Sequence, residues 1–384
     1  MIKSIKIMLL PNNVQKTRLF QHAGAARFIY NWVLAKEEEN YKTGGKFLSY
    51  YDLCKELTEI KKMDEYAWLK DISSTTLQAA VKDACEAYAK FFKKKAKHPK
   101  FKSRNKSTPN FYQSNQVIEF TDTHVKLSCL SNSQKVNKRH LNWVRLAEHG
   151  KIPIDVKPSN PRITFDGLNW WISVGIEYPD KEIKLSEEGL GVDLGIRNLA
   201  VCSDDSIYPN INKTKKIKDL EKQMRRLQHS ISRKYEMNKE GSEFVKTKNI
   251  IKSEQKLLKM HHRLNNIRKN YLHNTSKEIV DKNPKFICID NLDIQKMMKN
   301  KYLAKAIQDQ SLYEFSRQLE YKSKYKGISF IRAEKNYPSS KKCNCCGRIN
   351  KDFKLYQKTF RCECGNVIDI NKQAALNLKA YGEK

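Results

Sequence analysis

Five of the ten cysteines gather between Cys343 and Cys364, near the end of the 384-residue chain. Cys343 and Cys346 form a C-x-x-C pair, Cys362 and Cys364 form a C-x-C pair, and a glycine follows each pair. Paired thiolates of this kind supply the four sulfur ligands of a tetrahedral site, and the glycines permit turns that aim backbone N–H groups at sulfur. The spacing therefore predicts a structural Zn²⁺ site, in which Cys345 could replace one of its neighbours.

Two acidic residues and one short polar segment stand where apolar runs end. Asp193 follows the apolar run 190–192, Asp290 closes the run 286–290, and a polar segment occupies 369–371. We expect the three distant segments to form one pocket of the kind that holds a catalytic metal. A plain turn is the competing interpretation for the first of them, since an Asp near a Gly is also common in turns.

The composition favours a nucleic-acid-binding protein. Lys and Arg number 74 against 42 Asp and Glu, which gives a formal net charge of +32 and a pI near 9.6. Such a charge attracts polyanions over most of the surface. We find no signal peptide and no run of about 18 apolar residues, so no membrane partner is expected. The other five cysteines are scattered singly, as in proteins of a reducing compartment such as the cytoplasm.

A basic segment with interleaved aromatic residues extends from Phe91 to Lys106 and contains eight Lys or Arg and no acid. A solvated charged loop is one interpretation. We favour a phosphate-binding loop, because uncompensated cations repel one another unless a polyanion lies against them. The expected phosphate ligands are Lys93, Lys94, Lys95, Lys97, Lys100, Lys102 and Arg104.

The first half of the chain combines helices with short strands. Residues 1–10 alternate as a strand does and should pair with a much later segment, and apolar residues recur at helical spacing between 15 and 95. Alternating runs between 116 and 178, with Asp166-Gly167 as the clearest turn, predict β-hairpins. We expect these strands and the first strand to close into a small antiparallel barrel.

The second half mixes long helices with buried strands. Apolar residues step three and four apart through 217–231 and 257–271, around a polar turn at 238–242, which predicts a basic helical hairpin of coiled-coil character. Its Lys and Arg could lie along a nucleic-acid backbone or remain solvated. A helix over 303–325 and a strand over 327–334 are expected to follow.

The order of these motifs resembles that of the TnpB proteins of transposons, relatives of the type V CRISPR effectors. The resemblance rests on GVDLGIRNLAV, FICIDNLDI, NYPSSKKCNCCG, FRCECG and a final D-x-N…AALN, and it covers nearly the whole chain. It implies a multidomain α+β protein with a helical recognition region, a β-barrel wedge domain, and an RNase H-like (RuvC) domain with an inserted zinc ribbon. The implied boundaries are 13–115 for the recognition region, 1–12 and 116–180 for the wedge, 186–340 and 366–384 for the RuvC-like domain, and 341–365 for the ribbon.

The resemblance also implies partners. Proteins of this kind use a guide RNA to bind double-stranded DNA beside a short flanking motif, so base pairing reads the target and the protein reads only that motif. Tyr51, Thr76 and Gln78 lie where the readers of the flanking motif are expected in the family.

Two of the three expected catalytic positions depart from the family pattern. Asp193 matches the first acid, but Asp290 stands where the family has Glu, and Asn371 stands where it has the catalytic Asp. Asn offers one neutral carbonyl oxygen where metal-dependent hydrolysis needs an anionic ligand, and Asp is one methylene shorter than Glu. We therefore expect weak or absent Mg²⁺ binding and a disabled nuclease. The alternative is that Asp369 has moved into the metal site and preserves weak cleavage.

These observations lead to the hypothesis of an RNA-guided DNA-binding protein that represses transcription by occupying its target, similar to the nuclease-dead TnpB-like repressors (TldR). An active RNA-guided endonuclease and a basic DNA-binding protein that uses no guide remain as alternatives. The expected location is the bacterial cytoplasm, at the nucleoid when the target is bound.

Overall fold

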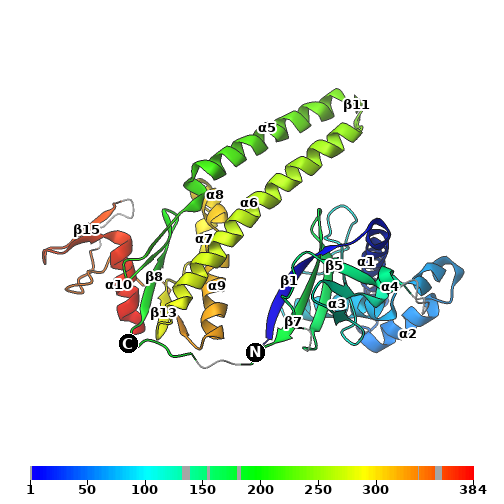
Figure 1. Cartoon of the computed structure of the whole chain (residues 1–384), viewed down its shortest axis with the longest axis horizontal. Helices are drawn as coiled ribbons and strands as arrows, with labels where there is room; N and C mark the ends of the chain where they lie inside the picture. Colours follow the sequence, from blue (N-terminus) through cyan, green and yellow to red (C-terminus); the bar gives the residue numbers. More distant parts are fainter. Residues whose placement is uncertain (1, 132–138, 154–155, 180–182, 336, 351–356) are drawn as a thin grey trace. The chain divides into compact units, whose positions relative to one another are not determined.

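The computed structural model describes residues 2–131, 139–153, 156–179, 183–335, 337–350 and 357–384. The chain folds as two compact units, Met1–Pro179 and Asp180–Lys384 (Figure 1). Each unit has its own sheet and its own hydrophobic core. None of the described helices is both long and apolar enough to cross a membrane.

The N-terminal unit is built on a seven-stranded sheet with the order β2-β6-β7-β1-β5-β4-β3, in which neighbouring strands are antiparallel. Its strands are β1 (Ile2–Leu10), β2 (Asn110–Tyr112), β3 (Glu119–Phe120), β4 (His124–Lys126), β5 (Trp143–Leu146), β6 (Ser159–Phe165) and β7 (Trp170–Glu177). β1 pairs with β7 from Ile2 opposite Glu177 to Leu9 opposite Trp170. The prediction that the first strand pairs with a much later segment is confirmed.

This sheet is open, so the predicted closed barrel is wrong. β2 and β3 form the two edges, and they do not pair with each other. They are three and two residues long, which is too short for the ladder that would close a barrel. Helices α1 (Asn13–Lys42) and α3 (Ser74–Phe92) contact β2 instead, and a covered edge strand is protected from pairing with other chains.

The helices of this unit share one core with the sheet. Leu19 and Ile29 of α1, Leu77 of α3, and Ile7 and Ile172 of the strands belong to a single buried cluster. The smaller helical elements are α2 (Tyr50–Ile60), α4 (Arg139–Asn142) and the 3₁₀ turns η1 (Asp64–Asp71) and η2 (Ser128–Leu130). The regions expected as separate recognition and wedge parts are thus packed together, and each depends on the other for burial of its apolar face.

The C-terminal unit contains a five-stranded mixed sheet with the order β10-β9-β8-β13-β14. Its strands are β8 (Leu190–Leu194), β9 (Asn198–Cys202), β10 (Ile207–Pro209), β13 (Phe286–Ile289) and β14 (Ser329–Arg332). β8, β13 and β14 are parallel, whereas β9 and β10 join as antiparallel hairpin strands. The strands predicted around residues 190, 199, 287 and 329 are confirmed.

Helices lie on both faces of this sheet (Figure 1). Side chains of α6 (Lys248–Asp281) and α9 (Leu312–Tyr325) pack on one face with Val192 and Ile289. On the other face α10 (Ile370–Gly382) crosses β8 so closely that a Cβ on Gly191 would lie 2.0 Å from the carbonyl oxygen of Ala375. Only glycine at this position permits that approach.

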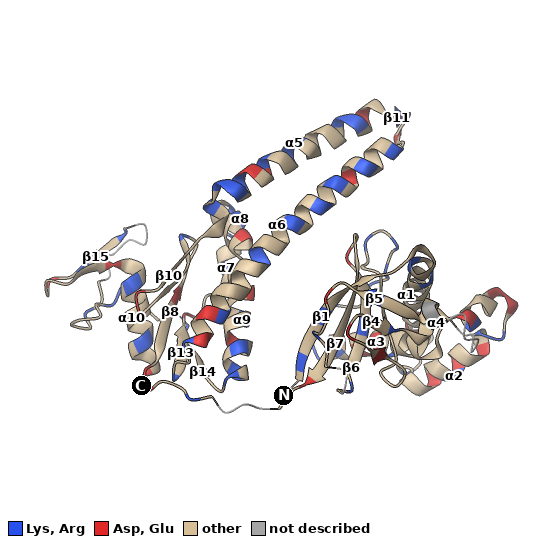
Figure 2. Cartoon of the chain, viewed as in Figure 1, with Lys and Arg blue, Asp and Glu red and all other residues tan. Residues whose placement is uncertain are grey.

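The predicted helical hairpin is confirmed. α5 (Lys215–Met237) and α6 pack through Ile217, Leu220, Met224 and Leu264, and the short strands β11 (Lys239–Glu240) and β12 (Glu243–Phe244) join them at the tip. Figure 2 shows Lys and Arg along both helices. The helix predicted over 303–325 is instead two helices, α8 (Lys301–Gln310) and α9, because Ser311 between them is left-handed with a φ of 53°. The short α7 (Ile294–Met298) precedes them.

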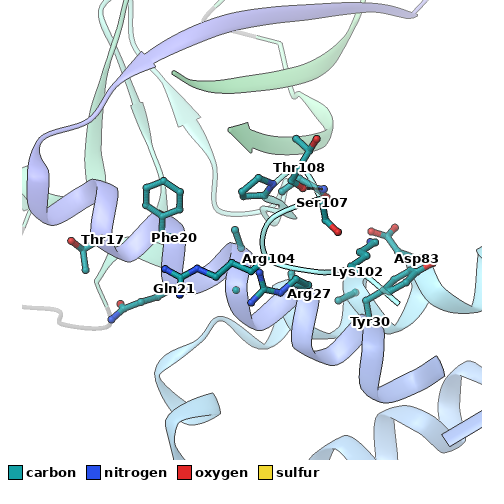
Figure 3. A pocket seen from close by; sticks show the side chains of 16 residues that line it. Thr17, Phe20, Gln21, Arg27, Tyr30, Asp83, Lys102, Arg104, Ser107 and Thr108 are labelled. Atoms are coloured by element: carbon teal, nitrogen blue, oxygen red, sulfur yellow. Dashed lines mark hydrogen bonds between the residues drawn. The ribbon is translucent and has the colours of Figure 1, made fainter. Parts of the chain in front are cut away.

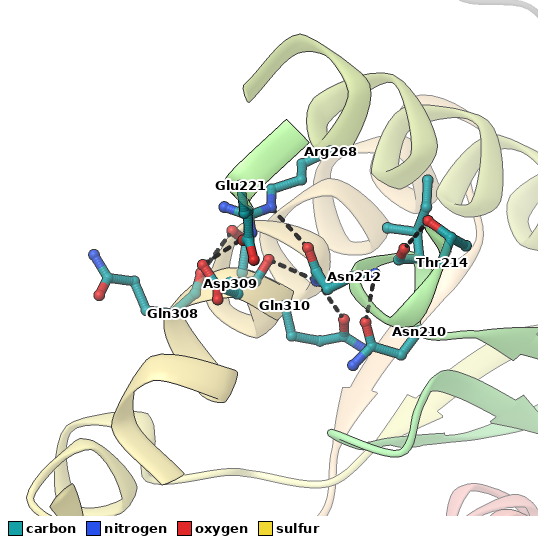
Figure 4. Close-up of polar contacts among 10 residues, drawn as sticks. Asn210, Asn212, Thr214, Glu221, Arg268, Gln308, Asp309 and Gln310 are labelled. Atoms are coloured by element: carbon teal, nitrogen blue, oxygen red, sulfur yellow. Dashed lines mark hydrogen bonds and ion pairs between the residues drawn. The ribbon is translucent and has the colours of Figure 1, made fainter. Parts of the chain in front are cut away.

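A polar cluster fixes the root of the hairpin (Figure 4). The half-buried Arg268 of α6 donates to Asn212 Oδ1 at 2.7 Å and forms ion pairs with Glu221 and Asp309, both at 3.0 Å. Asn212 in turn donates to the Asp309 carbonyl at 3.0 Å and to Gln310. One guanidinium therefore ties α5, α6 and the end of α8 together, which gives the hairpin a rigid base.

Candidate functional site

The two acids expected at strand ends are neighbours in the folded chain. β8 and β13 are adjacent and parallel, with Val192 opposite Ile289, so the next residues along them, Asp193 and Asp290, emerge side by side at the carboxyl edge of the sheet. Alternation along a strand places Asp193 on the same face as Gly191, which is the face that α10 covers. By the same alternation Asp290 shares its face with Cys288, which packs with Leu378 of α10.

Burial and mutual repulsion disfavour the charged forms of these acids. Burial, followed by the negative charges of Asp290 and Asp369, raises the pKa of Asp193 to about 8. Burial also raises the pKa of Asp290 to about 6, although the Ser339 hydroxyl donates to its Oδ2 at 3.0 Å and opposes the shift. Crowded carboxylates of this kind gain from a divalent cation, which replaces the repulsion with attraction.

Asp369 and Asn371 lie at the beginning of α10 and differ in what they do there. Asp369 is the exposed N-cap residue, and its Oδ1 accepts from the N–H groups of Asn371 at 2.9 Å and Lys372 at 3.3 Å. Asn371 lies one helical turn before Ala375, the residue that covers Gly191, and therefore shares the helix face that is turned toward β8. Asn371 is therefore a neutral residue on the helix face that is turned toward β8, whereas the Asp369 charge at the same end of α10 acts on Asp193.

Lys372, the next residue on α10, is directed away from the acids. Its ammonium donates to the Ser203 carbonyl at 2.8 Å and pairs with Asp205 at 2.6 Å. Both partners belong to the turn between β9 and β10. This contact fixes how the amino end of α10 is placed over the sheet.

The four predicted zinc ligands converge. The sulfur atoms of Cys343, Cys346, Cys362 and Cys364 all lie within 4.8 Å of one another. Two of the separations are 3.7 Å, between Cys343 and Cys364, and 3.6 Å, between Cys346 and Cys362. A tetrahedral Zn²⁺ with bonds of about 2.3 Å requires sulfur separations of about 3.8 Å, so the donor set fits this ion. Cys345 is exposed and lies outside the group.

The glycines act at this site as the spacing predicted. Gly347 and Gly365 have φ angles of 74° and 90°, which other residues rarely adopt. Burial alone would raise the pKa of Cys343, but N–H groups of Cys346 and Cys345 and the Asn366 amide donate to its sulfur and lower the pKa to about 6. The thiolate form that binds metal is therefore favoured. Residues 351–356 of the expected ribbon lie outside the described residues.

Hydrogen bonds connect the cysteine site to the acid site. No sequence pattern predicted the residues that form these bonds. The buried Asn377 of α10 donates to the carbonyls of Ser339 and Lys342 at 2.7 and 2.6 Å. Asn366 donates both to Cys343 Sγ and to the buried Gln373 of α10. Since Ser339 also donates to Asp290, the ribbon and the acids share one polar framework. In the sequence, the AALN segment that contains Asn377 is distinctive only through its resemblance to a family pattern.

The basic segment 93–104 follows the end of α3. Lys102 differs from the others because it is half-buried, with its ammonium 3.5 Å from the centre of the Tyr30 ring. The other expected phosphate ligands are exposed, and within the described residues none of them forms an ion pair: Lys93, Lys94, Lys95, Lys97, Lys100 and Arg104. Unpaired exposed cations are available to a polyanion.

The residues expected to read a flanking motif differ in how exposed their side chains are. Gln78 lines a groove of about 570 Å³ between α3 and β6, together with Lys82, Asn115 and Arg162. Tyr51 is 75% exposed on α2. Thr76, in contrast, is 1% exposed and donates its hydroxyl to the Tyr112 carbonyl at 2.9 Å. Direct contact between Thr76 and a base is therefore not possible in this conformation, because the hydroxyl is already used to hold α3 against β2.

Three family profiles match the chain. The profile described as "Probable transposase" (OrfB of IS605) matches residues 173–301, and "Cas12f1-like, TNB domain" matches 313–378. A "Helix-turn-helix domain" profile of the same OrfB group matches 1–46, where this chain has β1 and the single long helix α1. The first two matches contain both strand-end acids and all four clustered cysteines.

Curated relatives are similar along almost the whole chain. "Putative RNA-guided DNA endonuclease InsQ" of Escherichia coli (strain K12) is 29% identical, over 99% of this chain and 92% of that protein. "Putative RNA-guided DNA endonuclease" of Streptomyces pristinaespiralis is 28% identical, over 99% of this chain and 89% of that protein. A cryo-EM structure of a Cas12f1–sgRNA–target DNA complex shares the fold, with a TM-score of 0.62 and 16% identity over 95% of this chain and 82% of that one. The chain is thus similar over almost its whole length to these putative RNA-guided DNA endonucleases, and over residues 173–301 to the OrfB proteins of IS605-type transposons. It has a multidomain α+β fold with a RuvC-like domain.

Proposed function

We propose that this protein binds double-stranded DNA under the direction of a guide RNA, and that it represses transcription by occupying its target without cutting it. The names of its relatives support the RNA-guided part of the proposal. The net charge of +32 and the unpaired cations of segment 93–104 supply the attraction to nucleic acid that such a complex needs.

One observation carries the loss of cleavage. Asn371, a neutral residue, lies on the α10 face turned toward β8, where the strand-end acids Asp193 and Asp290 meet. Metal-assisted phosphodiester hydrolysis needs anionic oxygens that hold Mg²⁺ beside the scissile phosphate. With a neutral third position and a shortened second acid, Mg²⁺ binds weakly, and the transition state loses several kcal/mol of stabilisation.

The remaining parts have binding roles in this proposal. Zn²⁺ held by the four clustered cysteines keeps the ribbon folded and takes no part in chemistry, because a closed set of four sulfur ligands leaves no open position. Tyr51 and Gln78 read the motif that flanks the target. The helical recognition region, the wedge and the RuvC-like domain each contribute contacts to the guide or to the paired target strand.

The test uses the full chain, purified from cells that also express RNA transcribed from the DNA next to its gene. The co-purifying RNA is sequenced, and a plasmid that matches it is offered with Mg²⁺. We expect guide-dependent binding and no cut product. Efficient cleavage by the unchanged protein overturns the proposal, and the absence of any specific RNA favours a guide-independent DNA-binding protein instead.

A second candidate function is a weak RNA-guided endonuclease in which Asp369 is the third carboxylate. The observation that favours it is the contribution of the Asp369 charge to the raised pKa of Asp193. Slow cleavage that Asp369→Asn abolishes, and that Asn371→Ala leaves unchanged, would identify this function. The N-cap bonds of Asp369 to two backbone N–H groups compete with metal ligation, which is why we place this candidate second.

A further inference from the structure

A cavity of about 600 Å³ lies in the N-terminal unit (Figure 3), whereas the acids and the clustered cysteines belong to the C-terminal unit. One wall is a single face of α1, and the opposite wall is the segment from Lys102 to Asn110, with Ala80 and Asp83 of α3 between them. The α1 residues of this wall are Thr17, Phe20, Gln21, Ala23, Gly24, Ala26, Arg27 and Tyr30. A Cβ added to Gly24 would meet nothing within 4 Å, so the space above the helix is open and has the size of a small-ligand pocket.

The cavity is strongly cationic. Arg27 and Arg104 both line it, and in the described part of the chain neither forms an ion pair. Asp83 does not neutralise them, because both of its oxygens are bound by Arg162, at 2.5 and 2.7 Å. Two guanidinium groups without acidic partners suit a phosphate, which accepts from the planar fork of Arg.

A fixed aromatic ring stands in the same cavity. The Phe20 side chain meets Phe165 at 5.0 Å and Trp170 at 4.9 Å between ring centres, both edge to face. These contacts hold the ring from beneath, yet Phe20 remains 44% exposed. An exposed ring whose orientation is already set can stack a nucleic-acid base without an ordering cost.

The opposite wall is also held in place before any ligand binds. Asn31 of α1 donates to the Lys102 carbonyl at 2.9 Å and accepts from the Lys102 N–H at 2.8 Å. At the other end, the Phe165 N–H donates to the Pro109 carbonyl at 2.9 Å. The segment therefore keeps its distance from α1, and Ser107 and Thr108 present hydroxyl groups along it.

We propose that this cavity binds one unstacked nucleotide of a single-stranded RNA, with its phosphate between Arg27 and Arg104 and its base on Phe20. A base within a duplex cannot reach the ring, because its faces are covered by its neighbours. The hydroxyl and amide groups of Thr17, Gln21, Ser107 and Thr108 favour RNA over DNA, since they match a ribose 2′-OH. This inference deepens the proposed function, because it takes RNA as a bound partner.

The test measures the affinity of the full chain for three fluorescent probes: a 12-nucleotide single-stranded RNA of mixed sequence, the DNA of the same sequence, and the same RNA fully paired in a blunt-ended duplex. We expect Arg27→Gln/Arg104→Gln to weaken binding of the single-stranded RNA about tenfold and binding of the RNA duplex less than about twofold. The matched control Lys55→Ala/Arg145→Ala removes two exposed cations outside the cavity. It should affect both RNA probes equally and slightly.

A second variant tests the ring separately from the charge. Phe20→Leu keeps apolar volume against Phe165 and Trp170 but removes the flat face, so it should weaken single-stranded RNA binding about fivefold, with an unchanged dependence on salt. Equal losses of affinity for the single-stranded RNA and the RNA duplex overturn the proposal, and so does equal binding of the RNA and DNA single strands. Guided binding to a matching duplex is measured in parallel, so its failure with intact single-strand binding counts against the proposed function alone.

Discussion

The cysteine site and the acid site are both joined to α10, and they differ in the residues that meet there. All four cysteine sulfur atoms converge at separations that suit Zn²⁺. At the acid site the strands place Asp193 and Asp290 side by side, but α10 brings the neutral Asn371 toward them. A structural metal that holds a small domain together is required for folding, whereas a catalytic metal can be lost while the fold remains. Under the proposed function, the scaffold is kept and the chemistry is lost.

Polar contacts link the cysteine site to the acid site. Asn377 joins α10 to the ribbon, and Ser339 joins the ribbon to Asp290. Among the described residues, the buried apolar cluster at the ribbon consists of Cys343, Phe360 and Ile370 of α10, with Cys362 and Ile368 packed against them. Such a small core depends on its metal.

The largest expected effect comes from the cysteine side of this comparison. Cys343→Ser/Cys362→Ser should abolish zinc binding and unfold the ribbon, because structural Zn²⁺ sites contribute on the order of 10 kcal/mol. Zinc content, measured by mass spectrometry, should fall from one ion per chain to none. Cys345→Ser, at an exposed cysteine outside the cluster, is the control and should retain the ion. Full zinc retention by the double variant would contradict the assignment.

The next largest effect is expected from a substitution at the contact between α10 and β8. Gly191→Ala places a Cβ 2.0 Å from the Ala375 carbonyl oxygen, so α10 must move away from the sheet at a cost of about 3 kcal/mol. Chemical denaturation measures this loss in the free energy of unfolding. Gly24→Ala is the matched control: it meets no atom within 4 Å on α1 and should increase stability by up to about 1 kcal/mol. Similar effects of the two changes would show that α10 does not lie as described.

Restoring the acids should produce a smaller effect, confined to the acid site. Asn371→Asp/Asp290→Glu supplies the carboxylates of the family pattern and should tighten Mg²⁺ binding at least about tenfold, as measured by calorimetry. Asn265→Asp/Asp219→Glu makes the same charge change on the exposed faces of α6 and α5 and should not alter Mg²⁺ binding. Unchanged affinity in the first variant would mean that Asn371 does not occupy the third position.

The pH dependence of stability gives the smallest effect. The folded state holds the Asp193 proton up to a pKa of about 8, above the ordinary value of 3.8. The folded chain therefore binds more protons than the unfolded chain between these values, and stability falls as pH rises through this window. Asp193→Asn removes this decline, so it should raise the melting temperature by a few degrees near pH 8 and hardly at all near pH 4, without divalent cations. A parallel decline in both proteins would contradict the burial of this acid.

Local patterns were sufficient to predict several elements of this protein. Strands β8 and β13 and the hairpin of α5 and α6 follow from apolar periodicity over neighbouring residues. Asp290 lies directly after β13, as expected, whereas β8 continues past Asp193 to the buried Leu194. The zinc ligands follow from spacing, because C-x-x-C and C-x-C pairs bring their sulfur atoms together through turns of a few residues. The break at Ser311 had no such signal, since the left-handed conformation there depends on how α8 and α9 pack.

Tertiary structure decided what depends on contacts between distant segments. Edge strands decide whether a sheet closes, and here β2 and β3 are too short, so the expected barrel is an open sheet. The neighbouring placement of Asp193 and Asp290 depends on the register of two strands that are almost a hundred residues apart. The burial of Thr76 and the cavity between α1 and the Lys102–Asn110 segment arise from packing of whole helices. Spacing along the chain specifies which residues can carry chemistry, and only long-range packing determines which of them meet.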